Sequence, residues 1–124
     1  MALKILVVDD EPDIVKVLVA RLKEQGFETI TASDGQQALE QAEECQPDLI
    51  ILDIMMPGMD GTEAAQKLKE NPQTMGIPII FLSALQTKSN EQNEGQKSGG
   101  NIILAKPIEL KFLLAKIKEM TSVG

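Results

Sequence analysis

The chain of 124 residues contains no histidine, tryptophan or tyrosine, and it has a single cysteine. One cysteine cannot form a disulfide within the chain, and a zinc site would lack its usual ligands, so any metal site must use oxygen atoms. No stretch approaches the ~18 apolar residues that a membrane-spanning helix needs, and no signal peptide is visible. These absences predict a cytoplasmic protein that does not enter a membrane.

Basic residues are also few, and the formal net charge is −7. The lysines and the arginine are scattered along the chain, whereas a nucleic-acid surface needs them clustered, so we expect no direct DNA binding. The length suits a single domain over residues 1–124, and 43% hydrophobic residues can fill one core.

Apolar segments of strand length alternate with amphipathic segments of helix length, the pattern typical of a parallel α/β sheet. Strands are predicted at 4–8, 28–32, 49–52, 79–82 and 101–105, and helices at 12–25, 34–45, 61–70 and 109–120.

The segment 86–98 differs from the others because it contains no apolar residue. Two parallel strands need a crossover connection between them, so a helix is expected here. A helix without an apolar stripe has little to hold it on a sheet. We therefore predict a short, frayed or mobile helix, with a disordered loop as the alternative.

Polar side chains follow four of the predicted strands. The first of these strands is followed by Asp9 and Asp10, and the others by Asp53, Ser83 and Lys106. Because open α/β sheets bind ligands at the carboxyl ends of their strands, we expect these side chains to gather at one edge.

Three carboxylates at one edge would repel each other unless a cation lay between them. Mg²⁺ prefers oxygen ligands and binds with one or two carboxylates plus phosphate. A carboxylate can also accept a phosphoryl group, which an ammonium group such as Lys106 and a hydroxyl such as Ser83 would stabilise. The alternative is that the acids cap helices or lie solvated in turns.

Four motifs carry a family resemblance. They are Val7-Val8-Asp9-Asp10-Glu11-Pro12, the segment Leu52-Asp53-Ile54-Met55-Met56-Pro57-Gly58-Met59-Asp60-Gly61, Leu82-Ser83-Ala84 and Ala105-Lys106-Pro107. In order and spacing, nearly the whole chain resembles the CheY-like receiver domain of bacterial two-component response regulators. The resemblance implies a flavodoxin-like, doubly wound sheet of five parallel strands in the order 2-1-3-4-5, with helices on both faces.

The resemblance also implies the site's roles. Asp53 would be the phosphoacceptor, supplied by a sensor histidine kinase or a histidine phosphotransfer protein. Asp10, Asp53 and the backbone carbonyl of Met55 would bind Mg²⁺ directly, and Asp9 would act mainly through water.

Lys106 would contact the phosphoryl group, and a cis peptide between Lys106 and Pro107 would aim it. Ser83 would move inward as a switch residue. The domain would not be an enzyme beyond self-phosphorylation from a donor and self-dephosphorylation. The self-dephosphorylation should be slow, because Met55 and Leu85 are apolar at positions that border the path of the attacking water in the family.

Departures from the family pattern fall on one face, made of 86–98, 101–105 and 109–120. The second switch position holds Ile103 instead of an aromatic residue, and Ile108 replaces a usual phenylalanine. This is the family's output and dimerisation face, so we expect an unknown output partner and a monomer or weak dimer through it. We expect ordering of 83–98, not an aromatic switch, to be the main response.

Three other functions remain as alternatives. A degenerate receiver would work by phosphorylation-independent protein contact. An aspartate-nucleophile phosphatase would need a second Asp where Met55 stands. A flavin- or nucleotide-binding protein would need a glycine-rich turn in place of Asp9-Asp10-Glu11.

Overall fold

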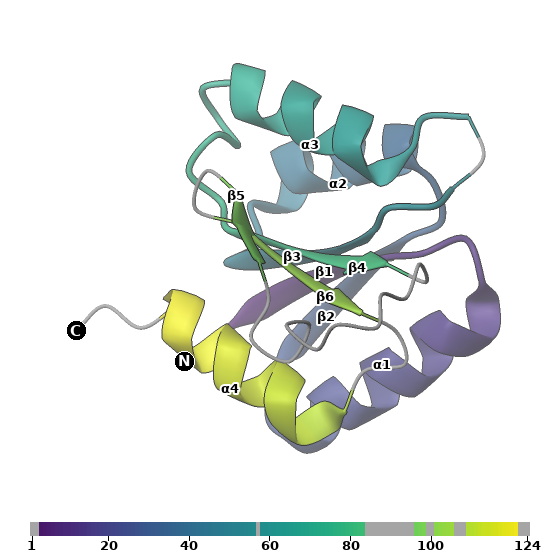
Figure 1. Cartoon of the computed structure of the whole chain (residues 1–124), viewed down its shortest axis with the longest axis vertical. Coiled ribbons are helices and arrows are strands. Elements are labelled where there is room, and N and C mark those ends of the chain that lie inside the picture. The colour runs from purple at the N-terminus through teal and green to yellow at the C-terminus, as the bar shows by residue number, and fades with distance from the viewer. Residues whose placement is uncertain (1–2, 57, 84–95, 99–100, 106–108, 122–124) are drawn as a thin grey trace.

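A computed structural model describes residues 3–56, 58–83, 96–98, 101–105 and 109–121. One sheet lies between two pairs of helices, α2 and α3 on one face and α1 and α4 on the other (Figure 1). In chain order the elements are β1 (Lys4–Val8), α1 (Pro12–Glu24), β2 (Glu28–Ala32), α2 (Gly35–Cys45), β3 (Leu49–Asp53), α3 (Gly61–Glu70), β4 (Ile79–Ser83), β5 (Gln96–Ser98), β6 (Asn101–Ala105) and α4 (Leu110–Thr121).

The sheet confirms the flavodoxin-like architecture. Its strand order is β2-β1-β3-β4-β6-β5, and the first five of these strands pair in parallel. With β6 as the predicted fifth strand, the order 2-1-3-4-5 holds. The chain reverses its direction of travel across the sheet between β1 and β3, and the carboxyl ends beside this point form the usual ligand edge of such sheets.

The prediction for 86–98 is wrong at its end, where the sheet has one strand in addition to the five predicted parallel strands. Residues Gln96–Ser98 form a sixth strand, antiparallel to β6, with Ser98 opposite Asn101. The two residues between them in the sequence are both glycine, a pair typical of tight hairpin connections. An edge strand this short can be polar, because it does not need an apolar face on both sides. Residues 86–95 lie outside the described residues.

Both faces of the central strands are buried, since helices cover each face and successive side chains point to opposite sides. Towards α2 and α3 lie Leu6, Val8, Ile50, Leu52, Ile79 and Phe81. Towards α1 and α4 lie Ile5, Val7, Leu49, Ile51, Ile80 and Leu82.

The helix ends follow local sequence signals. Pro12 occupies the first turn of α1, where its missing N–H costs nothing. The carboxylates of Asp34 and Asp60 cap α2 and α3 by accepting backbone N–H bonds of 2.8 and 2.9 Å. After α1 the chain turns at Gly26, whose φ of +90° favours glycine. Among the described helices, none is long and apolar enough to cross a membrane.

Candidate functional site

Three aspartates meet at the carboxyl edge of the sheet, as the sequence predicts. Asp9 directly follows β1, and Asp53 is the last residue of β3; both are buried, with 1% and 2% of their surface exposed. Asp10 is exposed. Each of the three contributes one carboxylate oxygen to a cluster in which these atoms lie within 4.8 Å of one another.

The backbone around these aspartates is fixed by hydrogen bonds. Asp9 donates its N–H to the carbonyl of Ala32 over 3.2 Å, and its Oδ1 accepts the N–H of Glu11 over 3.0 Å. On the other strand, Ile54 donates its N–H to the carbonyl of Leu82 over 2.9 Å. The acids are therefore anchored by the neighbouring strands β2 and β4.

Ser83 is the last residue of β4 and is also largely buried. In the pairing of β3 with β4, Asp53 lies opposite Leu82, so Ser83 is one position further towards the same edge. Ile103 lies on β6 opposite Phe81. The predictions for Lys106, Pro107, Ile108 and Leu85, the cis peptide included, concern residues outside the described ranges.

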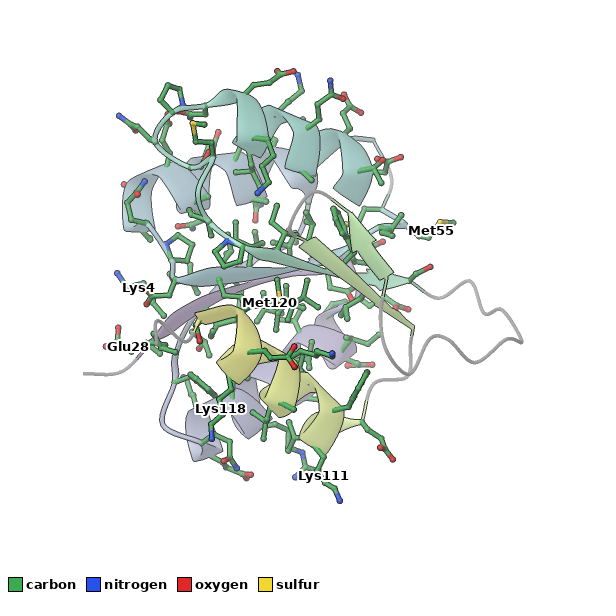
Figure 2. All side chains as sticks on the ribbon, turned by 60° about the vertical axis from the view of Figure 1, so that its left-hand side comes forward. Lys4, Glu28, Met55, Lys111, Lys118 and Met120 are labelled. Atoms are coloured by element: carbon green, nitrogen blue, oxygen red, sulfur yellow. The ribbon has the colours of Figure 1, made fainter. Side chains whose placement is uncertain are left out.

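Met55 lies in the loop after β3 and is 54% exposed. Figure 2 places its side chain at one end of the sheet, away from Lys4 and Glu28 at the opposite end. That Met55 borders the path of the attacking water stays a prediction.

Asp60 and Gly61, the last two residues of the quoted motif, make contacts that the sequence pattern does not predict. Gly61 donates its N–H to the carbonyl of Ile54 over 2.9 Å and packs against the backbone of Asp53. Asp60, just before it, accepts hydrogen bonds from the backbone of Glu63 and, over 2.8 Å, from the hydroxyl of Thr62. These bonds lower the pKa of Asp60, because they favour the charged carboxylate.

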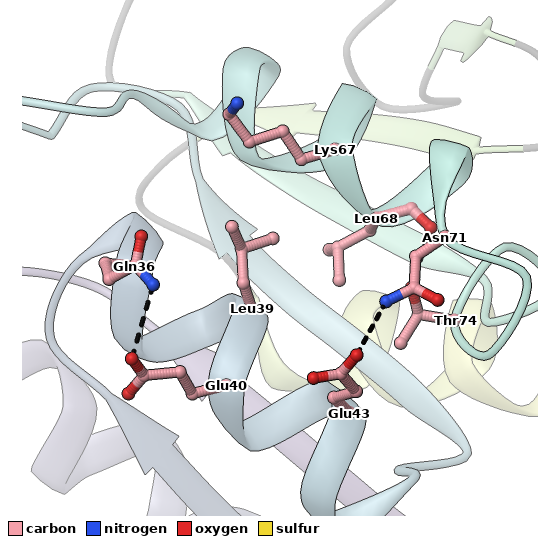
Figure 3. A pocket seen from close by; sticks show the side chains of 8 residues that line it. All are labelled: Gln36, Leu39, Glu40, Glu43, Lys67, Leu68, Asn71 and Thr74. Carbon is pink, nitrogen blue, oxygen red and sulfur yellow. Dashed lines mark hydrogen bonds between the residues drawn. The ribbon is translucent and has the colours of Figure 1, made fainter.

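A hollow of about 450 Å³ opens beside the acidic cluster. Asp9 and Asp10 line one part of it, and the rest comes from α1, the end of β2 and the start of α2. A smaller hollow of about 150 Å³ lies between α2 and α3, where Asn71 donates a 3.0 Å hydrogen bond to Glu43 (Figure 3). Only the first of these two hollows adjoins the acids.

The donor set fits a hard divalent cation. All three candidate ligand groups are carboxylates, and oxygen ligands suit Mg²⁺. A cation between them would also offset the mutual repulsion of three negative charges held within a few ångströms. The residues present therefore match the metal that the sequence predicts.

A family model for the response regulator receiver domain matches residues 5–118. The chain belongs to this family of two-component signalling domains, whose role is phosphorylation-dependent signalling. Receiver domains receive their phosphoryl group from histidine kinases or phosphotransfer proteins.

The curated relatives are longer proteins. Response regulator PleD of Caulobacter vibrioides is 41% identical over 121 residues, 98% of this chain and 26% of PleD. The transcriptional regulatory protein PhoP of Bacillus subtilis, named for alkaline phosphatase synthesis, is 41% identical over 93% of this chain and 47% of its own length. The DNA-binding response regulator MtrA of Mycolicibacterium smegmatis is 37% identical, and the match covers 58% of it. The chain thus spans between 26% and 58% of these relatives.

Solved structures match over almost their whole length. Chemotaxis protein CheY4 of Vibrio cholerae has a TM-score of 0.83 and 32% identity, covering 97% of this chain and 99% of that one. The receiver domain of sensor histidine kinase PA1611 from Pseudomonas aeruginosa has a TM-score of 0.83 and 27% identity, covering 99% and 100%. The PA1611 structure has a magnesium ion coordinated in its active-site cleft.

Proposed function

We propose that this chain accepts a phosphoryl group on Asp53 in the presence of Mg²⁺ and signals through the resulting change of its surface. One observation carries the proposal: Asp53 lies buried at the end of β3, with its carboxylate in a cluster with those of Asp9 and Asp10. A nucleophilic carboxylate flanked by two further acids, at the ligand edge of a receiver fold, suits phosphoryl transfer through an aspartyl phosphate.

The proposed chemistry is a displacement at phosphorus. A carboxylate oxygen of Asp53 forms a bond to the phosphorus of the donor, and the bond from phosphorus to the donor's histidine nitrogen or acyl oxygen breaks. The bonding electrons leave with the donor. In the return step, water attacks the same phosphorus, the bond to Asp53 breaks, and inorganic phosphate leaves as the carboxylate is restored.

The residues have separate parts in this chemistry. Asp10, Asp53 and the backbone carbonyl of Met55 would hold Mg²⁺, and Asp9 would act mainly through water. Bound Mg²⁺ would neutralise charge on the phosphoryl oxygens. Asp9 is well suited to an outer role, since its Oδ1 already accepts the Glu11 N–H.

Two further side chains complete the proposed site. Ser83 would donate its hydroxyl to a phosphoryl oxygen, and Lys106 would place its ammonium group against another. The position of Ser83 at the end of β4, one residue past the partner of Asp53, supports its part. Ile103 would take the second switch position, and a cis bond before Pro107 would aim the lysine.

The partners follow from the family. We propose a sensor histidine kinase or a phosphotransfer protein as donor, in the cytoplasm, and slow self-dephosphorylation as the only return reaction catalysed by the chain. The output partner would bind the face that includes β6 and α4, through which a weak dimer is also proposed. The relative MtrA is a DNA-binding response regulator, but the chain covers 58% of it. The prediction of no direct DNA contact therefore applies to this chain alone.

The test is the intact mass of the protein after incubation with acetyl phosphate. With Mg²⁺ the wild type should gain one phosphoryl group, while wild type in EDTA and Asp53→Asn with Mg²⁺ should gain none. Asp48→Asn is a matched control, because Asp48 precedes β3 at the opposite end of that strand from Asp53 and should leave uptake unchanged. No gain in the wild type, with acetyl phosphate or with histidine-kinase donors, would favour phosphorylation-independent contact instead.

A further inference from the structure

We propose that Gly61 and Gly35 are positioning residues for the acidic site, because the missing side chain of each lets a helix begin against the segment that carries Asp53. The inference rests on the proposed function, since it concerns how Asp53 and the Met55 carbonyl are held for Mg²⁺. Neither glycine has a side chain that could contact the carboxylate cluster. Their effect is exerted through the backbone.

Gly61 is the first residue of α3 and packs on the backbone of the proposed phosphoacceptor. A Cβ at this position would overlap the carbonyl oxygen of Asp53 and would lie only 2.8 Å from the Cα of Ile54. The end of β3 cannot easily move away from Gly61, because Ile54 donates a hydrogen bond to the carbonyl of Leu82 on β4. A side chain at residue 61 would therefore push α3 and the end of β3 apart and stretch the Gly61–Ile54 hydrogen bond.

Gly35 fixes the far part of the same loop. A Cβ here, at the start of α2, would lie 2.9 Å from the Cβ, the Cγ and the carbonyl oxygen of Met59. Two of these three atoms belong to the backbone or lie next to it, so rotating the Met59 side chain cannot relieve the overlap. The loop after Asp53 is thus held between the first residues of two helices.

Conformational freedom does not explain these two glycines. Among the described residues, the glycines with positive φ are Gly26 and Gly58, so the backbone at Gly61 and Gly35 is one that alanine adopts. Alanine is also the better helix former, by about 1 kcal/mol in helix interiors. From helix propensity alone, alanine at position 61 or 35 should stabilise its helix. From the close packing, the same substitution should displace the loop between β3 and α3.

Mg²⁺ binding is the sensitive measure of such a displacement. The ion demands near-octahedral geometry at about 2.0–2.1 Å, so a ligand that moves by a few tenths of an ångström binds less well. Changes in groups that orient metal ligands typically cost about 10–100-fold in affinity. We expect Gly61→Ala and Gly35→Ala to raise the Mg²⁺ dissociation constant by about tenfold or more.

The experiment titrates each purified variant with Mg²⁺ and follows backbone amide shifts by NMR, with unfolding in urea measured in EDTA. Gly76→Ala is the neutral control, since no atom lies within 4 Å of a Cβ there. Gly26→Ala is the control for reduced stability. The φ of +90° at this position strains alanine, but no atom lies within 4 Å of the added Cβ. Met59→Gly, alone and combined with Gly35→Ala, tests for rescue, because it removes two of the three atoms in the overlap.

Three results together would support the inference. Mg²⁺ binding should weaken in Gly61→Ala and Gly35→Ala, and it should stay unchanged in Gly26→Ala and Gly76→Ala. Met59→Gly should partly restore the affinity of Gly35→Ala. Wild-type affinity in Gly61→Ala and Gly35→Ala would overturn it. An equal loss of affinity in Gly26→Ala would also overturn it, because reduced stability would then be the cause. If Gly61→Ala does not fold, Gly35→Ala and its rescue decide alone. Absence of Mg²⁺ binding in the wild type would instead refute the proposed function, and the inference with it.

Discussion

Replacing Asp53 by asparagine should make the metal-free protein more stable, although it destroys the proposed phosphorylation site. The substitution keeps the shape of the side chain and removes one of three clustered negative charges. Two of the three pairwise repulsions in the cluster disappear with that charge. What remains is a single pair, Asp9 with Asp10.

The size of the effect follows from the separation of the carboxylates. At 4.8 Å, two unit charges repel by about 0.9 kcal/mol in a water-like dielectric and about 3.5 kcal/mol at an effective dielectric constant of 20. At this largest separation in the cluster, two pairs give about 2 kcal/mol in the water-like dielectric and about 7 kcal/mol at a dielectric constant of 20. Because Asp10 is exposed, we expect about 2 kcal/mol, which would raise the melting temperature by about 6–10 °C.

The assay is urea and thermal unfolding of wild type and Asp53→Asn, first in EDTA and then with Mg²⁺. The wild type should gain about 2.7 kcal/mol at a Mg²⁺ concentration one hundred times the dissociation constant, while Asp53→Asn should gain much less. Glu44→Gln removes an exposed charge on α2 and controls for the overall net charge. An Asp53→Asn protein less stable than wild type in EDTA would refute the reasoning, since repulsion would not then be the dominant effect.

Further predictions concern caps, core and loop. Asp34→Ala removes the cap of α2 and should lower the free energy of unfolding by about 1 kcal/mol in urea, with Asp34→Asn nearly neutral. Leu22→Ala, at a fully buried position of α1, should cost about 2–5 kcal/mol in the same assay. Since the pKa of Asp60 is lowered in the folded state, its contribution exists at neutral pH and is lost as the pH falls below about 4. Unfolding of wild type and Asp60→Asn from pH 3 to 7 should therefore converge at the acidic end. Met55→Asn should shorten the lifetime of the phosphorylated protein, followed by intact mass, and an unchanged lifetime would show that the exposed methionine does not restrict water.

The sequence was sufficient for the parallel strands and the acidic edge, for a physical reason. Central strands covered on both faces are continuous apolar runs, so β1, β3 and β4 are recognisable, and the first polar residue after such a run marks the strand's end. This places Asp9 and Asp53 at one edge without any knowledge of their contacts. Strands β3 and β4 each extend one residue further than predicted, so Asp53 and Ser83 belong to the strands themselves.

Two features could not be predicted by the same reasoning. Strand β5 is a polar edge strand, so it gives no hydrophobic signal, and its one indication was the glycine pair between it and β6. The close approach of Gly61 to Asp53 depends on where α3 begins relative to β3, which no periodicity in the sequence reveals. A glycine at a helix start is equally compatible with open space.

The most direct test of the central claim is to locate the phosphoryl group. Borohydride reduces an aspartyl phosphate to homoserine, so protein treated with acetyl phosphate and Mg²⁺ can be reduced, digested and sequenced by mass spectrometry. We expect homoserine at position 53, dependent on Mg²⁺ and absent from untreated protein. Homoserine at position 9 or 10 with Asp53 intact, or phosphoryl uptake without any homoserine, would contradict it.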